Sequence, residues 1–125
     1  MAIKKIFVID DDEMLTMMLS DHLQKNEEYQ ISVFHTGESA IESLNQEPDV
    51  VILDYQLNSV VEDAKDGMHI LQSIKKMDNH MAVIMLSSQD NYGKAVQTII
   101  KGALEYVVKD DLAFERIDRI IKNLE

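Results

Sequence analysis

The sequence contains no cysteine and has little proline, glycine and arginine. Without cysteine, disulfide bonds, thiolate nucleophiles and zinc–thiolate sites are excluded. One proline and four glycines leave little material for a flexible linker, so we expect a single domain over residues 1–125. No apolar run approaches the roughly 20 residues that a membrane-spanning helix needs. These features favour a cytoplasmic globular domain without a membrane partner.

Positive charge is also scarce. The chain has 12 lysines and arginines against 23 aspartates and glutamates, which gives a formal net charge of −11. A field of this sign repels nucleic acid, so we expect no direct nucleic-acid binding, and it attracts cations. Solubility accounts for most of the surplus carboxylates, but a few of them lie directly after apolar runs.

Two kinds of apolar pattern alternate along the chain. The runs 5–9, 49–53 and 82–86 are rich in β-branched residues and show little alternation, which is typical of strands buried on both faces. The stretches 30–34 and 104–108 have more polar positions and are predicted to form strands at the sheet edges.

Between these strands, apolar residues recur at steps of three and four. This spacing predicts helices over 14–23, 37–44, 68–77, 95–101 and 112–124. Five strands alternating with five helices predict an α/β fold, in which right-handed crossovers place helices on both faces of a parallel sheet.

Several side chains can be assigned within this pattern. We expect four methionines to lie on buried faces: Met14, Met18, Met81 and Met85. We also expect Asp90 to cap the fourth helix and either Asp110 or Asp111 to cap the fifth. Lys94 and Arg116 are assigned to solvated helical faces.

In a parallel sheet of this kind, ligands bind beyond the carboxyl ends of the strands. The residues that follow the first, third, fourth and fifth strands are Asp10, Asp11 and Asp12, then Asp54, Ser87 and Lys109. We therefore expect three oxygen-bearing strand ends and one ammonium group to converge at one rim of the sheet.

Crowded carboxylates at this rim call for a cation. Two of them about 4 Å apart repel by roughly 4 kcal/mol at an effective dielectric constant near 20. Mg²⁺ fits, with Mn²⁺ as a substitute, because it takes oxygen ligands and retains waters that a phosphate can displace. Lys109 and the Ser87 hydroxyl can then neutralise a phosphoryl group in transfer. Asp54, which stands alone on the central strand, is the predicted nucleophile.

Four stretches carry a resemblance to a known family: KIFVIDDDEML, DVVILDYQL, AVIMLSSQD and GALEYVVKDD. They resemble the four signature blocks of bacterial response-regulator receiver domains, occur in the same order and span essentially the whole chain. The resemblance implies a flavodoxin-like, doubly wound sheet of five parallel strands in the order 2-1-3-4-5.

The resemblance also implies roles for individual residues. Asp54 matches the phosphoacceptor. Asp11 matches the direct Mg²⁺ ligand, Asp10 its partner acting through water, and the backbone carbonyl of Gln56 completes the protein ligands. Ser87 matches the hydroxyl switch residue, Lys109 the family's lysine, and Tyr106 the aromatic switch.

The implied function is a signalling switch and not a turnover enzyme. A sensor histidine kinase or phosphotransfer protein would donate the phosphoryl group from phosphohistidine. Ser87 would then move towards it, Tyr106 would turn inward, and the surface formed by the predicted fourth helix, fifth strand and fifth helix would repack. A downstream protein or effector domain would read that surface, with the chain as a monomer or a phosphorylation-dependent homodimer.

The sequence departs from the family pattern at three places. Asn58 replaces a proline and Asp66-Gly67 comes late, so residues 58–66 form a longer loop, which we hypothesise overhangs the site and shapes kinase recognition or phosphate lifetime. Asp110 replaces a proline that often follows a cis bond; it either pairs with Lys109 or caps the last helix, and the bond geometry is open. Ser88 offers a second hydroxyl beside Ser87.

Two other functions compete with this one. A phosphatase of the haloacid dehalogenase class would use Asp10 as nucleophile and Asp12 as acid–base. Met14 stands where that class has threonine or valine, and the chain is too short for the usual cap domain. The second rival is a pseudo-receiver that never takes phosphate, against which the intact set of strand-end residues argues.

Overall fold

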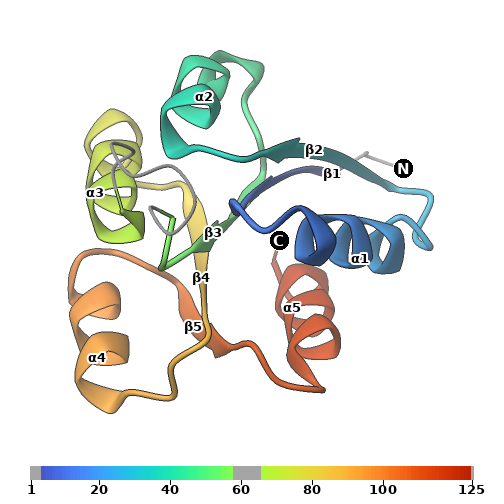
Figure 1. Cartoon of the computed structure of the whole chain (residues 1–125). Helices are drawn as coiled ribbons and strands as arrows, with labels where there is room; N and C mark the ends of the chain where they lie inside the picture. Colours follow the sequence, from blue (N-terminus) through green and yellow to red (C-terminus); the bar gives the residue numbers. More distant parts are fainter. Residues whose placement is uncertain (1–3, 58–65, 125) are drawn as a thin grey trace.

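The computed structural model describes residues 4–57 and 66–124 (Figure 1). Five parallel strands form one sheet in the order β2-β1-β3-β4-β5, which confirms the predicted flavodoxin-like topology. The strands are β1 Lys4–Ile9, β2 Tyr29–Phe34, β3 Val50–Asp54, β4 Ala82–Ser87 and β5 Glu105–Val108. The two strands with more polar positions, β2 and β5, lie at the sheet edges as expected.

Five α-helices cover the two faces of this sheet. They are α1 Glu13–Leu23, α2 Gly37–Glu42, α3 Gly67–Met77, α4 Tyr92–Ile100 and α5 Ala113–Lys122. A short 3-10 helix, η1 Leu44–Gln46, follows α2, which is therefore shorter than predicted. Figure 1 shows α1 and α5 on one side of the sheet and α2, α3 and α4 on the other.

The core is divided by the sheet into two apolar layers. Because successive side chains of a strand point to opposite faces, Phe7 and Ile9 pack with α2 and α3, while Ile6 and Val8 pack with α1 and α5. All five residues of β3 are buried, since this strand is covered on both faces. This explains why the central apolar runs lack alternation.

The prediction for α1 was wrong at two methionines. Met14 is 66% exposed and Met18 is 52% exposed, whereas Met81 and Met85 are buried as expected. The buried face of α1 instead contains Thr16, whose hydroxyl is satisfied within the helix by donating to the carbonyl of Glu13 at 2.9 Å. A polar residue thus takes a core position, which turns the methionines outward.

The predicted helix caps also need correction. Asn91, and not Asp90, caps α4, because its side chain accepts from the amide of Lys94 at 3.0 Å. Leu112 holds the cap position of α5, where neither Asp110 nor Asp111 lies. Asp110 lies two residues before this cap, and its carboxylate accepts from the amide of Leu112 at 3.0 Å.

Asp110 does not pair with Lys109. It forms an ion pair with Arg116 at 2.8 Å, and this contact lowers the pKa of Asp110. The described residues contain no cis peptide bond, so the bond between Lys109 and Asp110 is trans. Within the same described ranges, no helix has the length and apolarity to cross a membrane.

The longer loop predicted at 58–66 lies outside the described residues except for its last position. Asp66 caps α3, because its carboxylate accepts from the amide of His69 at 3.0 Å and also contacts the imidazole. The hypothesis about the rest of that loop stays a prediction.

Candidate functional site

The strand ends meet at one rim because the strands are parallel, and the hydrogen-bond ladder continues one residue beyond them. The amide of Asp10 donates to Phe34 at 3.0 Å, and the amide of Tyr55 donates to Leu86 at 2.9 Å. The amide of Lys109 donates to the carbonyl of Ser87 at 2.7 Å. These bonds fix the residues after β1, β3 and β5 relative to the neighbouring strands.

Three carboxylates come together at this rim. Oxygens of Asp10, Asp11 and Asp54 all lie within 4.8 Å of one another, and all three residues are buried. The structure therefore brings together the acids that the sequence placed after β1 and at the end of β3.

One ammonium group bridges two of the acids. The Nζ atom of Lys109 lies 3.1 Å from Oδ2 of Asp10 and 3.1 Å from Oδ1 of Asp54. Burial lowers the pKa of Lys109, but the adjacent carboxylates of Asp10 and Asp54 together raise it, and the net direction is upward. Lys109 therefore stays charged at neutral pH.

The raised pKa of Asp10 shows that the positive charge of Lys109 does not offset the negative charge of the three acids. Burial, followed by repulsion from Asp54, raises the pKa of Asp10 to about 7, against the lowering effects of the Asp12 amide and Lys109. Its buried Oδ2 atom has the ion pair with Lys109 but no contact of hydrogen-bond geometry. A buried carboxylate oxygen without a hydrogen-bond donor, among three acids, fits a hard divalent cation, which prefers oxygen ligands.

The two serines at the end of β4 differ in position. Ser87 is fully buried, and its Oγ accepts from Nε2 of Gln56 at 3.1 Å and from the amide of Gln89 at 3.1 Å. Ser88 is exposed, and its amide donates to Oε1 of Gln56 at 3.4 Å. Ser87 is therefore the hydroxyl inside the rim.

Sequence reasoning missed what the side chain of Gln56 does. The family resemblance implied a role for its carbonyl, whereas the structure shows its carboxamide bridging the ends of β3 and β4. The backbone amide of Gln56 also donates to Oδ1 of Asp54 at 3.2 Å. A glutamine two residues after a strand carries no signal of such a bridge.

Tyr106, the predicted aromatic switch, is half-buried on β5. Its ring packs against the core layer beneath α3, and its hydroxyl donates to the carbonyl of Gln89 at 2.7 Å. Since Gln89 also donates its amide to Ser87, one residue links the buried hydroxyl to the aromatic ring.

The geometry does not favour the phosphatase alternative. Asp12, its required acid–base residue, is the N-cap of α1, where its carboxylate accepts from the amide of Leu15 at 3.1 Å.

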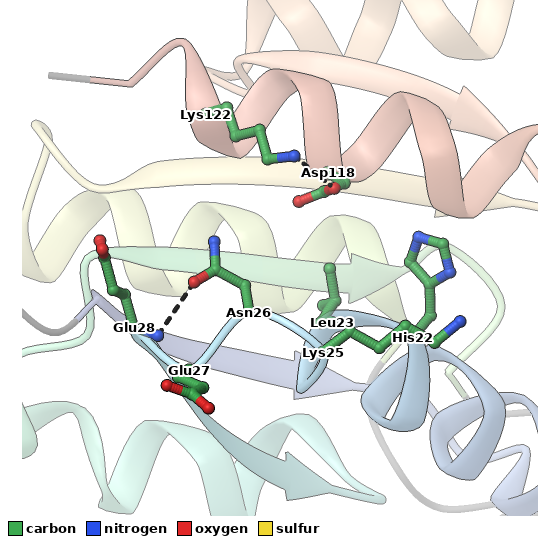
Figure 2. A pocket seen from close by; sticks show the side chains of 8 residues that line it. All are labelled: His22, Leu23, Lys25, Asn26, Glu27, Glu28, Asp118 and Lys122. Carbon is green, nitrogen blue, oxygen red and sulfur yellow. Dashed lines mark hydrogen bonds and ion pairs between the residues drawn. The ribbon is translucent and has the colours of Figure 1, made fainter.

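One cavity in the described part of the chain lies away from the rim. It measures about 750 Å³ and lies between the end of α1, the loop before β2 and α5 (Figure 2). Its lining is His22, Leu23, Lys25, Asn26, Glu27, Glu28, Asp118 and Lys122. None of the predicted site residues is among them, and its mixture of acids and bases selects no ligand charge.

Solved structures of several receiver domains are similar to this chain over most of its length. The receiver domain of NtrX from Brucella abortus is 26% identical, with a TM-score of 0.81 over 94% of each chain. A longer NtrX chain is 28% identical, with a TM-score of 0.83 over 98% of this chain and 27% of its own length. The BeF3-activated DrrB receiver domain is 28% identical, with a TM-score of 0.75 over 97% of this chain and 99% of that one.

The family model for the response regulator receiver domain matches residues 6–122. That match covers nearly the whole chain and includes every strand end described above. The chain belongs to the response regulator receiver domain family, the phosphoacceptor signalling domains of two-component systems.

Proposed function

We propose that Asp54 accepts the phosphoryl group, from a phosphohistidine donor and beside a bound Mg²⁺ ion. The observation that carries this assignment is the position of its carboxylate. Asp54 lies within 4.8 Å of the two other acids, and its Oδ1 atom is 3.1 Å from the Lys109 ammonium. A nucleophile, a cation site and a fixed positive charge thus share one rim.

In the transfer step, a carboxylate oxygen of Asp54 bonds to phosphorus as the bond from phosphorus to the donor's imidazole nitrogen breaks. The electron pair of that bond returns to the imidazole nitrogen. Lys109 and the hydroxyl of Ser87 stabilise the charge on the phosphoryl oxygens. Oδ1 of Asp54 is held by Lys109 and by the amide of Gln56, which fixes the orientation of the carboxylate.

The acids provide the metal site. Asp10, Asp11, Asp54 and the backbone carbonyl of Gln56 would hold Mg²⁺, or Mn²⁺ in its place. When bound, the ion supplies two positive charges that offset the acids and the incoming phosphoryl oxygens.

Ser87 must change partners for this step. Its Oγ atom is now engaged by the side chain of Gln56 and the amide of Gln89. A move towards the phosphoryl group would loosen both bonds, and Gln89 would carry the change to Tyr106. The α4–β5–α5 surface would repack, and a downstream protein or effector domain would read it. In this role the domain is a switch whose phosphorylation and hydrolysis set a signal.

The surface beside Lys109 suits a docked donor protein. Met18 and Lys109 line a cavity of about 370 Å³ between α1 and α5, and exposed Met14 and Leu112 are apolar neighbours on the same two segments. Because Lys109 belongs to both the cavity and the acceptor site, a sensor histidine kinase or phosphotransfer protein seated here would hold its phosphohistidine over Asp54.

Met18→Ser tests this docking surface. Transfer from a purified phosphotransfer protein that phosphorylates the wild type should slow by about fivefold, from the loss of about 1 kcal/mol of apolar burial. Phosphorylation by acetyl phosphate should not change. Met77→Ser is the matched control, because Met77 is 60% exposed on α3. Equal transfer rates in both variants would refute the assignment.

Intact-mass measurement tests the proposed function itself. After incubation with acetyl phosphate and Mg²⁺, the wild-type protein should gain the mass of one phosphoryl group, and Asp54→Ala should not. Excess chelator should abolish the gain. A gain that persists in Asp54→Ala would refute the acceptor assignment, and no gain in the wild type would support the pseudo-receiver. The cytoplasmic location and the oligomeric state stay predictions.

A further inference from the structure

The residue after the acceptor occupies an unusual place. The ring of Tyr55 contacts a side chain of β5 and a side chain of α4. Its centroid is 6.4 Å from that of Tyr106, with the planes at 74° in an edge-to-face arrangement. The Nζ atom of Lys94 lies 5.3 Å from the centroid of the Tyr55 ring.

The backbone of Tyr55 is tied closely to the acceptor. Its amide donates to Leu86 at 2.9 Å, and its carbonyl accepts from the amide of Gly67 at 3.1 Å. A Cβ atom at Gly67 would lie 2.3 Å from the carbonyl of Asp54 and 2.7 Å from Cα of Tyr55. With β4 on one side and the start of α3 on the other, Tyr55 cannot move independently of Asp54.

Both partners of the ring meet again at Gln89. The hydroxyl of Tyr106 donates to the carbonyl of Gln89, and Nζ of Lys94 donates to its side-chain Oε1. Tyr55, Tyr106, Lys94 and Gln89 therefore close a ring of contacts that joins β3, the β4–α4 loop, the first turn of α4 and β5. This set of contacts was not predicted from the sequence, because the apolar pattern placed Lys94 on a solvated face.

We propose that Tyr55 is a positioning residue that couples the acceptor to the α4–β5 surface. This coupling rests on the proposed phosphorylation of Asp54. It adds a second route from Asp54 to the α4–β5 surface, one that does not pass through Ser87. A change at Asp54 shifts the shared backbone, and the ring of Tyr55 transmits the shift to Tyr106 and to Lys94. Aromatic and cation–π contacts of this kind each change an equilibrium constant by about two- to tenfold. Such a change is enough to shift Tyr106 between two positions of its ring.

Amide NMR spectra with Mg²⁺ and beryllofluoride, which mimics the phosphoryl group on a carboxylate, test this coupling. In the wild type, amides at the acid cluster and amides of residues 92–108 should both shift. In Tyr55→Leu, the acid cluster should shift as in the wild type, while shifts over 92–108 should fall by about twofold, because the route through Ser87 and Gln89 remains. Tyr55→Phe keeps the ring and should restore them.

A control variant and a substitute variant make the NMR test specific to Tyr55. Tyr92→Leu removes a tyrosine of α4 that is 85% exposed, and it should leave the response of both regions intact. If Tyr55→Leu keeps the wild-type shifts over 92–108, or no longer binds beryllofluoride, the coupling role is wrong. Should Tyr55→Leu lose its folded spectrum, Lys94→Met takes its place: it removes the cation over the ring, and unchanged α4 shifts would overturn the proposal.

The result also separates this inference from the proposed function. If the wild-type acid cluster does not respond to beryllofluoride, or Asp54→Asn responds equally, the acceptor assignment fails and the coupling fails with it. If the cluster responds but residues 92–108 do not, the acceptor assignment stands and the coupling alone is refuted.

Discussion

The raised pKa of Asp10 makes the stability of the metal-free protein depend on pH. Burial and the charge of Asp54 raise this pKa from 3.8 to about 7. The folded state therefore binds a proton that the unfolded state has released between these values. The stabilisation is fully present below about pH 4 and is lost as pH rises through about 7, because ionisation then favours unfolding.

The magnitude follows from the two pKa values. Applied to them, the linkage relation gives a loss of about 2.5 kcal/mol in the free energy of unfolding between pH 5 and pH 8. In Asp10→Asn this contribution disappears, because an amide does not titrate. In Asp54→Asn it should shrink, because the second cause of the raised pKa is removed while burial remains.

Urea denaturation followed by circular dichroism, with chelator present, measures this effect. For each protein, the free energy of unfolding at pH 8 is subtracted from that at pH 5. The value for Asp10→Asn is then subtracted from the value for the wild type, which removes the contribution of the titrating groups that the two proteins share. If that difference is close to zero or has the opposite sign, Asp10 is not the protonated buried acid. Saturating Mg²⁺ should restore stability at pH 8 by about 2.7 kcal/mol at 100 times its dissociation constant.

Further predictions concern the lysine and two glycines. Lys109→Met should slow phosphorylation by acetyl phosphate by about 100-fold, measured as the initial rate of mass gain, because a fixed charge on the phosphoryl oxygens is lost; a rate near that of the wild type would contradict its role. Gly67→Ala should lower the free energy of unfolding by about 1–3 kcal/mol, because its Cβ would overlap the backbone of Asp54. Gly93→Ala is the control: the nearest atom is a side-chain oxygen at 3.4 Å, so urea denaturation should show a gain of up to about 1 kcal/mol.

The rim was predictable from the sequence because its positions follow from strand ends alone. A parallel sheet aligns the carboxyl ends of its strands, so any polar residue directly after a buried apolar run must lie at that edge. Asp10, Asp54 and Lys109 needed only this rule to be placed together. Their distances, which make Lys109 a bridge between two acids, needed the structure.

The errors arose where several side chains could satisfy one pattern. In α1, Met14 and Met18 fit an apolar spacing as well as the true buried face does, and the structure instead accommodates Thr16 by an internal hydrogen bond. At α4, Asp90 and Asn91 are both good caps, and only the backbone decides between them. Tyr55 could not be placed because both partners of its ring, Tyr106 and Lys94, lie far along the chain.

The charges at the rim explain why the switch should require a metal. Above the pKa of Asp10, three carboxylates and one ammonium leave two negative charges in a buried site. A phosphoryl donor approaches as an anion and would be repelled there. A bound divalent cation would cancel the excess and would displace the proton of Asp10, since only the ionised carboxylate is a good ligand. Affinity for Mg²⁺ should therefore fall as pH drops below about 7, and Asp10→Asn should lose that dependence. A calorimetric titration at pH 6 and pH 8 measures it, and equal affinities in the wild type would show that Asp10 is already ionised before the metal binds.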